Sequence, residues 1–309
     1  MLVLINPNAG GANALKKWGK LDDGLLDLSN GVRAFTMQDP SSFAFAIQRS
    51  FSLGERDFVA AGGDGTVNLV LDALVNLRKQ NRRNGVRLGA IGLGSSNDFH
   101  KPIHRNQLSN GIPIKLDFGN ARPRDIGRVR YDDNGRMIER FFISNASIGV
   151  TAEANHFFNN PGPLLRVLKR IHTPGAILYA ALNTILAYVN LPINFRKLER
   201  DEFTSPVTNL GILKNPHVSG DFCYQSSIPV DDGKFVVHLC HSMTTIELLR
   251  LLWALGRGQF ESVQKRRSWS VTGFSVHTST PFAVEFDGEV IRSSNVEFSV
   301  LPRFLKVCP

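Results

Sequence analysis

A glycine-rich junction between a short apolar strand and a helix constrains the fold of this chain more than any other feature. Phe58-Val59-Ala60-Ala61 is typical of a buried strand and residues 69–77 of a helix, and Gly62-Gly63-Asp64-Gly65-Thr66-Val67-Asn68 joins them. Glycines let backbone N–H groups approach an anion closely, and a helix N-terminus adds partial positive charge. The embedded carboxylate of Asp64 can hold a divalent cation. The junction therefore predicts a site for the phosphates of a nucleotide.

The first 120 residues alternate apolar strand-like runs with helical ones. Strands are expected at residues 2–5, 32–35, 57–61 and 87–92, and helices at 14–26, 42–51 and 67–78. This alternation is typical of parallel strands joined by helical crossovers, whose ligands lie beyond the carboxyl ends of the strands. We therefore expect an α/β domain with a parallel sheet and a ligand at the edge that carries the glycines.

After about residue 120 the pattern becomes strand-like with turn signals. Asp132-Asp133-Asn134-Gly135 separates two apolar runs and predicts a hairpin, while helical insertions are expected at residues 163–190 and 245–255. The sequence thus indicates two domains, 1–120 and 121–309, with a cleft between them. The second would be β-rich and sandwich-like, and its last segment, about 290–309, is expected to return to the first domain.

The charge balance favours an anionic partner without choosing one. The 309 residues include 36 Lys and Arg against 27 Asp and Glu, a formal net charge of +9. A nucleotide, a nucleic acid or an acidic bilayer surface would each fit. The basic run Lys265-Arg266-Arg267 is the only local hint of nucleic acid, and no nucleic-acid motif accompanies it. We therefore set nucleic acid aside as a partner.

Cysteine usage and apolar segments bear on the compartment. Three cysteines, an odd number without a Cys-x-x-Cys pair, favour neither a disulfide framework nor a zinc site. No signal peptide is evident, and residues 176–189 are too short to span a bilayer. We expect a cytoplasmic protein that touches the inner face of the membrane only from its surface. Residues 164–172, followed by 176–189, mix apolar and basic residues. This pattern is typical of an interfacial helix, and also of a core helix whose cations reach the surface.

Three further segments, and a second Asp-Gly turn, carry candidate chemistry. Asn6-Pro7-Asn8-Ala9-Gly10-Gly11 follows the first strand, and Gly92-Leu93-Gly94-Ser95-Ser96-Asn97-Asp98-Phe99 follows the fourth. Each is a plain turn or a phosphate contact. Phe286-Asp287-Gly288-Glu289 is a hairpin turn or holds a general base, and Asp231-Asp232-Gly233 is a hairpin, a hard-cation site or both.

Within the first junction, Thr66 is a candidate helix cap as well as a phosphate contact. The junction lacks the lysine of a P-loop, and Asn68 stands where the last glycine of Gly-x-Gly-x-x-Gly belongs. P-loop enzymes and dinucleotide-dependent dehydrogenases are therefore disfavoured.

Taken together in this order, the four segments resemble the motifs of the diacylglycerol kinase catalytic domain family, in particular its small bacterial lipid kinases. The opening is similar to Asn-Pro-x-Ser-Gly, residues 62–68 match Gly-Gly-Asp-Gly-Thr-x-Asn, and residues 94–98 are similar to Gly-Thr-x-Asn-Asp. Residues 287–289 match a late Asp-Gly-Glu element, and two weaker matches lie at 144–149 and 228–233. The resemblance extends over nearly the whole chain.

The resemblance implies a fold like that of NAD kinases and phosphofructokinases, with ATP on the first domain and a lipid entering the cleft. Asp64 and Asp98 would organise Mg²⁺ near the phosphates. Glu289, with Asp287 beside it, would accept the proton of the acceptor hydroxyl. A structural cation would lie at Asp232 with backbone oxygens of Pro229 and Lys234. Residues implied to contact ATP are Asn6, Asn8, Gly10, Thr36, Gly62, Gly63, Asp64, Gly65, Thr66, Val67, Asn68, Ser95 and Asn97.

The chain departs from the family pattern at several positions. Ala9 and Ser95 replace the serine and threonine of two motifs, Leu69 stands where many members carry glutamate, and His100-Lys101 replaces Ala-Arg. An NAD kinase would share the Gly-Gly-Asp-Gly core but carries a second Asn-Glu motif that has no counterpart here. A non-catalytic nucleotide or lipid sensor is the other alternative. The lipid acceptor and the oligomeric state stay open, and a homodimer through an exposed sheet edge is one arrangement.

Overall fold

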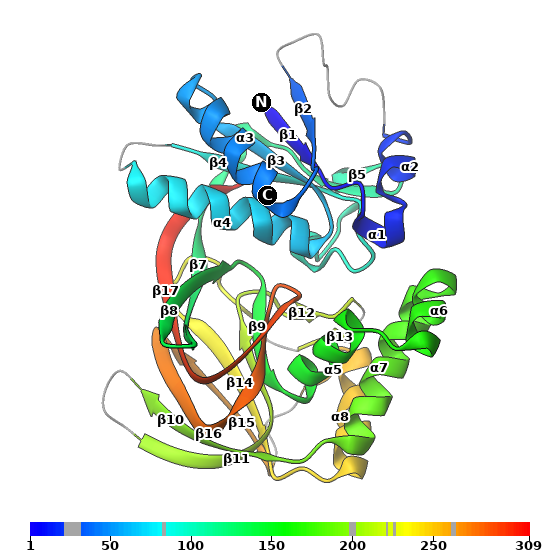
Figure 1. The fold of residues 1–309 in the computed structure, drawn as a ribbon, viewed down its shortest axis with the longest axis vertical. Helices are drawn as coiled ribbons and strands as arrows, with labels where there is room; N and C mark the ends of the chain where they lie inside the picture. Colours follow the sequence, from blue (N-terminus) through cyan, green and yellow to red (C-terminus); the bar gives the residue numbers. More distant parts are fainter. Residues whose placement is uncertain (22–31, 82–84, 198–201, 221, 225–226, 261–263) are drawn as a thin grey trace. The chain divides into compact units, whose positions relative to one another are not determined.

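The computed structural model describes residues 1–21, 32–81, 85–197, 202–220, 222–224, 227–260 and 264–309. The chain divides into two compact units. Unit 1 comprises Met1–Arg124 together with Arg303–Pro309, and unit 2 comprises Asp125–Pro302. Figure 1 gives the labels of the helices and strands.

Unit 1 is built on a parallel sheet. The order β2-β1-β3-β4 is formed by β1 (Leu2–Ile5), β2 (Arg33–Thr36), β3 (Asp57–Gly62) and β4 (Arg87–Gly92). The other side of β4 is shared by two short pairings. The end of β17 (Glu289–Val307) pairs in parallel with the start of β4, and β6 (Ile112–Lys115) pairs antiparallel further along. β5 (Leu108–Ser109) pairs with β6. The three apolar central strands are thereby buried.

Helices cover both faces of this sheet. On one face, α3 (Pro40–Ser52) and α4 (Asp64–Gln80) pack against each other and against β1 and β3 (Figure 1). On the other, α1 (Ala9–Ala12) leads into α2 (Ala14–Trp18), whose Ala14 joins a core with Ile91 and Ile112. The expected helix 14–26 ends at Trp18, and residues 22–26 of it lie outside the described residues.

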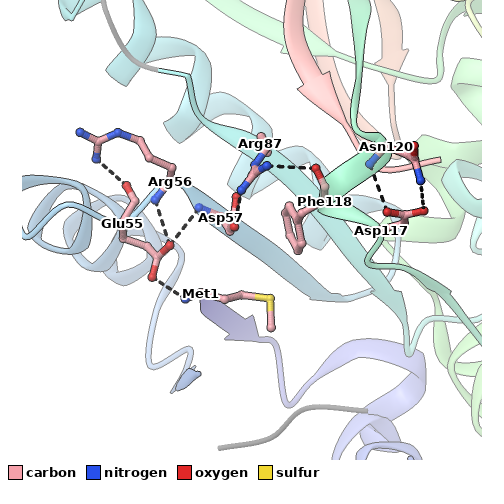
Figure 2. A network of polar contacts seen from close by, with 8 residues as sticks. All are labelled: Met1, Glu55, Arg56, Asp57, Arg87, Asp117, Phe118 and Asn120. Carbon is pink, nitrogen blue, oxygen red and sulfur yellow. Dashed lines mark hydrogen bonds and ion pairs between the residues drawn. The ribbon is translucent and has the colours of Figure 1, made fainter. Parts of the chain in front are cut away.

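Polar contacts fix the amino ends of the central strands. The Arg87 guanidinium at the start of β4 bonds the Asp57 carboxylate at the start of β3, with 2.7 Å between Nη2 and Oδ2 (Figure 2). The same guanidinium donates to the carbonyl of Phe118, which opens the 3₁₀ turn Phe118–Asn120. Glu55 accepts the N–H groups of Arg56 and Asp57. The register of β3 against β4 is therefore fixed at the end opposite the glycine loops.

Unit 2 is an antiparallel β structure with a phenylalanine-rich core, which includes Phe142, Phe195, Phe235, Phe274 and Phe298. Its main strand order is β15-β14-β11-β10-β16-β17, with β9 against β11 and β16, and with β8-β7 continuing from β17. The strands are β7 (Arg122–Asp133), β8 (Arg136–Phe142), β9 (Asn145–Gly149), β10 (Leu191–Lys197), β11 (Glu202–Leu213), β12 (His217–Val218), β13 (Phe222–Cys223), β14 (Phe235–His241), β15 (Arg266–Val271) and β16 (Gly273–Phe286). The expected hairpin is present as β7 and β8, which turn at Asn134-Gly135.

The helices of unit 2 follow one another in packing. α5 (Val150–Asn159) and α6 (Pro163–Ile171) both contact α7 (Thr173–Ala187), which in turn contacts α8 (Thr245–Gly256) (Figure 1). Expecting one helical insertion over 163–190 was wrong in one respect: the helix is interrupted at His172. Pro174 lacks an N–H and suits the first turn of a new helix, whose Gly175 N–H is capped by His172 Nδ1 at 3.1 Å.

The helix α5 was not expected from the sequence, because His156 and the asparagines around it blur its apolar stripe. In the described part of the chain, every helix is too short or too polar to cross a bilayer.

Candidate active site

Three glycine-bearing loops touch one another at the carboxyl ends of β1, β3 and β4. A Cβ added to Gly94 would lie 2.4 Å from the Cα of Gly63, and one added to Gly10 would lie 2.6 Å from the carbonyl oxygen of Leu93. Such distances are far inside van der Waals contact, so only glycine fits at these two positions. The backbone of the three loops is thus packed as one surface.

Side-chain hydrogen bonds link the same loops. Asn6 Nδ2 donates to Thr66 Oγ1 at 3.0 Å, and Asn6 Oδ1 accepts the N–H of Asn8. The N–H of Phe99 donates to Asp64 Oδ1 at 2.9 Å, which joins the loop after β4 to the first turn of α4. Asn6 and Asp64 therefore act in part as connectors between loops.

The start of α4 differs from the sequence expectation. The helix begins at Asp64 with Gly63 as its cap, so Thr66 lies inside the first turn and caps nothing. A carboxylate in a first turn complements the helix dipole, which explains why the helix extends back into the glycine segment. Thr66, Val67 and Asn68 are buried in α4, and Gly65 is half-buried.

Two of the residues predicted to contact ATP are exposed, and a third forms hydrogen bonds within its own loop. Thr36 ends β2 opposite Ile5, and Ser95 is exposed in the loop after β4. Asn97 has a left-handed backbone with φ of 50°, which asparagine tolerates better than most residues. Its side chain accepts the N–H of Gly94 and donates to the carbonyls of Gly92 and Gly94. Asn97 therefore shapes the loop.

Two residues in this region were missed by sequence reasoning. Lys17 Nζ donates to the carbonyl of Gly94 at 2.6 Å and to that of Leu93 at 3.2 Å, and burial lowers the pKa of Lys17. The basic residues near the end of α2 gave no signal, because the partners lie 76 and 77 positions away. His100 is buried at 3% exposure beside Phe99, and its ring nitrogens make no hydrogen bond of good geometry with the described residues, although the Ala90 backbone lies close enough to favour the charged ring. Burial, together with the nearby Lys115 ammonium, lowers the pKa of His100 to about 4.

Asp64 and Asp98 are the carboxylates expected at a nucleotide-bound magnesium ion. Asp64 uses one oxygen for the Phe99 N–H and keeps further lone pairs. Asp98 is buried and forms an ion pair with Lys101 at 2.8 Å. Mg²⁺ in kinases takes one or two protein carboxylates plus phosphate oxygens, so this donor set fits the ion.

The acidic turn in unit 2 contains three carboxylates with different tasks. Asp287-Gly288 forms the two-residue turn between β16 and β17, with φ of 45° and 91°. Asp287 accepts three backbone N–H groups, from Ile143 at 2.7 Å, Ser144 at 3.0 Å and Asn145 at 3.1 Å. Its carboxylate therefore anchors the turn to the chain segment before β9.

Glu285 and Glu289 complete the turn. Glu285 is buried, accepts the N–H of Gly288 at 2.7 Å and accepts the hydroxyl of Ser147 at 2.7 Å. Glu289 is exposed, and no described residue bonds its carboxylate. Of the two acidic residues predicted to act together, only Glu289 has oxygens available to a ligand. Glu285 was missed by sequence reasoning, because its position in an apolar strand resembles no motif.

The oxygens expected around a structural cation surround a lysine ammonium instead. Lys214 Nζ lies 2.8 Å from the carbonyl oxygens of Pro229 and Lys234 and 3.1 Å from Asp232 Oδ1. It also lies 2.8 Å from Asp125 Oδ2. A metal ion at that centre would clash with Nζ, so the residues present do not fit a cation there. The Asp231-Asp232-Gly233 segment is a loop between non-paired strands and not a hairpin.

Comparisons with known proteins agree with the motif resemblance. Residues 1–129 match the sequence profile described as the diacylglycerol kinase catalytic domain. A protein named diacylglycerol kinase from Staphylococcus epidermidis is 21% identical over 93% of this chain and 84% of its own length. One of the same name from Staphylococcus aureus is 22% identical over 99% of this chain and 90% of its own length. The resemblance expected from the motifs is thereby confirmed.

Solved structures show the fold. A crystal structure titled as a diacylglycerol kinase from Bacillus anthracis str. Sterne superposes with a TM-score of 0.68 at 14% identity, covering 99% of this chain and 95% of that one. A second structure from the same strain, of a protein provisionally titled diacylglycerol kinase, gives a TM-score of 0.73 at 17% identity over 99% and 94%. At these identities the likeness establishes the fold alone.

Proposed function

We propose that this chain, whose residues 1–129 match the sequence profile of the diacylglycerol kinase catalytic domain, is an ATP-dependent lipid kinase. It would transfer the γ-phosphate of ATP to a hydroxyl of a diacylglycerol-like or sphingoid-like lipid. The observation that carries the proposal is the mutual contact of three glycine loops at one edge of the parallel sheet. Phosphoryl transfer asks a protein mainly for positioning and charge stabilisation, and such a surface supplies both.

The nucleotide would be held by the backbone of these loops. The first N–H groups of a helix have no partner within it, and Gly63 as the cap of α4 brings no side chain in the way of a phosphate. Gly10, with φ of 59°, allows the first loop to pass against Leu93. Exposed Thr36 and Ser95 would add hydroxyl contacts. The positioning of the loops by Asn6, Lys17 and Asn97 would decide how well the phosphates fit.

Mg²⁺ would be held by the carboxylates of Asp64 and Asp98. When bound, the ion would supply charge neutralisation between the phosphates. Asp98 also forms an ion pair with Lys101, so its carboxylate would be shared between the ion and this ammonium.

Glu289 would accept the proton of the lipid hydroxyl. Its exposed and unengaged carboxylate supports this role, and a general base must have an oxygen free to reach its proton. Asp287 would position Glu289 through its three backbone N–H bonds and would not touch the reacting atoms.

Exposed apolar side chains on three helices of unit 2, α6, α7 and α8, support contact with a membrane. Leu186 and Val189 near the end of α7 are 71% and 78% exposed, Ile171 at the end of α6 is 77% exposed, and Trp253 of α8 is 62% exposed. The Arg257 guanidinium lies 4.0 Å from the ring of Trp253. Apolar side chains beside arginines are typical of surfaces that rest on anionic bilayers. The full set comprises Leu164, Val167, Ile171, Leu178, Leu182, Leu186, Val189, Ile246, Leu249 and Trp253.

The kinase proposal is tested by incubating the purified chain with labelled ATP, Mg²⁺ and a total lipid extract, followed by mass spectrometry of the phosphorylated lipids. Label in a lipid is expected for the wild type. Asp64→Asn, which keeps an acceptor for the Phe99 N–H but removes the charge, should lower the rate by about 100-fold or more. Glu202→Gln, an exposed substitution in unit 2, serves as the control.

Two outcomes of the same assay would contradict the proposal. Transfer of label to NAD in place of lipid would identify a soluble-substrate kinase. ATP binding without turnover on any lipid fraction would identify a nucleotide sensor on this fold.

Membrane contact is tested by flotation with vesicles that contain phosphatidylglycerol. Replacing Leu182 and Leu186 together by serine should weaken vesicle binding by about fivefold or more, because each buried methylene contributes roughly 0.8 kcal/mol. Leu53→Ser is the control, because Leu53 in unit 1 is exposed to about the same degree as Leu186. Unchanged flotation of the double variant would remove this surface from the proposal, as would its burial in a dimer seen by analytical ultracentrifugation.

A further inference from the structure

Lys214 is a lysine whose entire side chain is buried, in a cage made only of oxygen atoms. It follows β11 directly, its side chain is 0% exposed, and its Nζ has four oxygens within 3.1 Å. Two belong to the carboxylates of Asp125 and Asp232, and two are carbonyls of the 229–234 loop. Lysine is almost never fully buried unless it is paired, so this arrangement calls for a specific role.

The cage has the composition of a hard-cation site. Carboxylate and carbonyl oxygens drawn from a loop and a neighbouring strand are the ligands that calcium and magnesium select. Here the positive centre is covalently attached. An ammonium has three protons and no acceptor, so it satisfies several oxygens at once, as a small cation would.

The surrounding bonds show that the cage is complete without an ion. Two backbone N–H groups also bond the carboxylate oxygens that contact Lys214. The N–H of Gly233 donates to Asp125 Oδ2 at 2.8 Å, and the N–H of Lys234 donates to Asp232 Oδ1 at 3.1 Å. The N–H of Asp125 donates to the carbonyl of Val230 at 2.8 Å. Asp125 is 0% exposed, so loss of the ammonium would break a buried ion pair.

We infer that the Lys214 ammonium is a built-in structural cation, which takes the place of a bound divalent ion and makes the 229–234 loop independent of metal. A second cation within about 3 Å of Nζ would be strongly repelled in this dry interior, so the ammonium and a metal ion exclude each other. The inference concerns the architecture of unit 2 and does not depend on the proposed kinase activity.

Hydrogen bonds also connect the cage to the acidic turn at Asp287. The N–H of Lys214 donates to the carbonyl of Ser144 at 2.9 Å, and the N–H of Ser144 donates to Asp287 Oδ1 at 3.0 Å. The N–H of Asn215 donates to Asn145 Oδ1 at 3.2 Å. The segment that carries the ammonium is thus bonded to the segment that anchors Asp287.

The first experiment measures the melting temperature of the nucleotide-free wild type in excess chelator and in millimolar Mg²⁺ or Ca²⁺. The two values are expected to agree within about 1 °C, because the cage needs no ion. A drop in chelator that is absent from Asp232→Asn would place a metal in the cage and overturn the inference.

The second experiment removes the ammonium and offers a metal instead. Lys214→Ala should melt roughly 5–10 °C lower than the wild type in chelator, as expected for one broken buried pair. Mg²⁺ or Ca²⁺ should then restore at least half of the loss, because the vacated oxygens can hold the ion. Lys214→Met fills the same space without charge and should show no recovery with either metal.

Lys234→Ala is the matched control, because it removes one lysine charge from the same loop while its carbonyl stays in the cage. It should melt like the wild type under all conditions. A wild-type melting temperature for Lys214→Ala in chelator would overturn the inference. So would equal recovery of Lys214→Met by metal. If Lys214→Ala is recovered only as an unfolded chain, refolding it with and without Ca²⁺ gives the same comparison.

Discussion

Single carboxylates in this chain are distinguished by what already occupies their oxygens. The carboxylates of Glu285 and Asp287 accept hydrogen bonds from backbone N–H groups and a serine hydroxyl. Glu289, two positions after Asp287, has no bonded partner among the described residues. The sequence motif presents Asp287 and Glu289 as equivalent neighbours. The long-range bonds to residues 143–145 separate them into an anchor and a free group.

This division predicts that one substitution lowers activity and the other lowers stability. Glu289→Gln should leave the free energy of unfolding within about 0.5 kcal/mol of the wild type and lower kcat by about 100-fold or more, as for loss of a general base. Asp287→Ala leaves three buried N–H groups without an acceptor and should lower the unfolding free energy by roughly 3 kcal/mol. Urea denaturation and steady-state kinetics measure the two quantities. Equal stability loss in both variants would contradict the division.

His100 predicts a dependence of stability on pH. Its pKa of about 4 in the folded chain lies below the ordinary 6.5, so the unfolded chain binds more protons between these values. Stability should therefore fall as the pH drops from about 6.5 toward 4, by on the order of 1–2 kcal/mol at pH 5 from this residue alone.

His100→Phe tests the assignment, because the ring is buried beside Phe99 and its nitrogens make no hydrogen bond of good geometry with the described residues. The variant should be as stable as the wild type at pH 7.5 and should lose less stability by pH 5. His238, whose pKa burial also lowers to about 4, remains in both proteins and keeps part of the slope. Identical pH profiles would rule out His100 as a source of the effect.

At the scale of elements, a short helix holds the loop that follows a distant strand. α2 has only five residues, yet its Lys17 reaches the carbonyls of Leu93 and Gly94. Helices of this length contribute little stability of their own. The value of α2 to the site therefore lies in where it places one ammonium.

Removing that ammonium should loosen the loop after β4 more than it destabilises the fold. Lys17→Met keeps the apolar stem, and we expect the KM for ATP to rise by about tenfold, with a change in melting temperature below about 3 °C. Lys16→Met, at an exposed neighbouring position, controls for the loss of charge. An unchanged KM in the Lys17 variant would show that the loop keeps its shape without the ammonium.

Elements of unit 1 could be predicted well because their signals are local. The apolar runs and glycines mark where each strand ends, so β1, β3 and β4 begin and end within a residue of expectation. The motif order likewise predicted that the glycine loops belong together. Lys17 and Lys214 could not be predicted, because each contacts oxygens from segments far away in sequence and stands in an unremarkable run of residues.

At the scale of the whole molecule, unit 1 is assembled from the N-terminal 124 residues and the last seven residues of the chain. Lys306 and Val307 pair with β4, the N–H of Cys308 donates to the carbonyl of Leu88, and Leu305 is fully buried. These residues cover an edge of β4 that would otherwise present unpaired backbone groups.

Deleting Arg303–Pro309 should therefore weaken unit 1 selectively. Hydrogen exchange of backbone amides in β4 is expected to accelerate by about tenfold or more, while amides in the centre of β11 in unit 2 keep their protection. Mass spectrometry of exchanged peptides resolves the two strands. Equal acceleration in both would mean that the terminal segment supports the chain as a whole.

The same pairing sets an order of events during biosynthesis. A ribosome releases residues 1–124 long before it makes residue 306, so unit 1 lacks the segment that pairs with β4 while some 180 residues of unit 2 are made. During translation this unpaired strand edge is therefore open to aggregation for several seconds. Holdase chaperones that cover strand edges should raise the yield of folded protein.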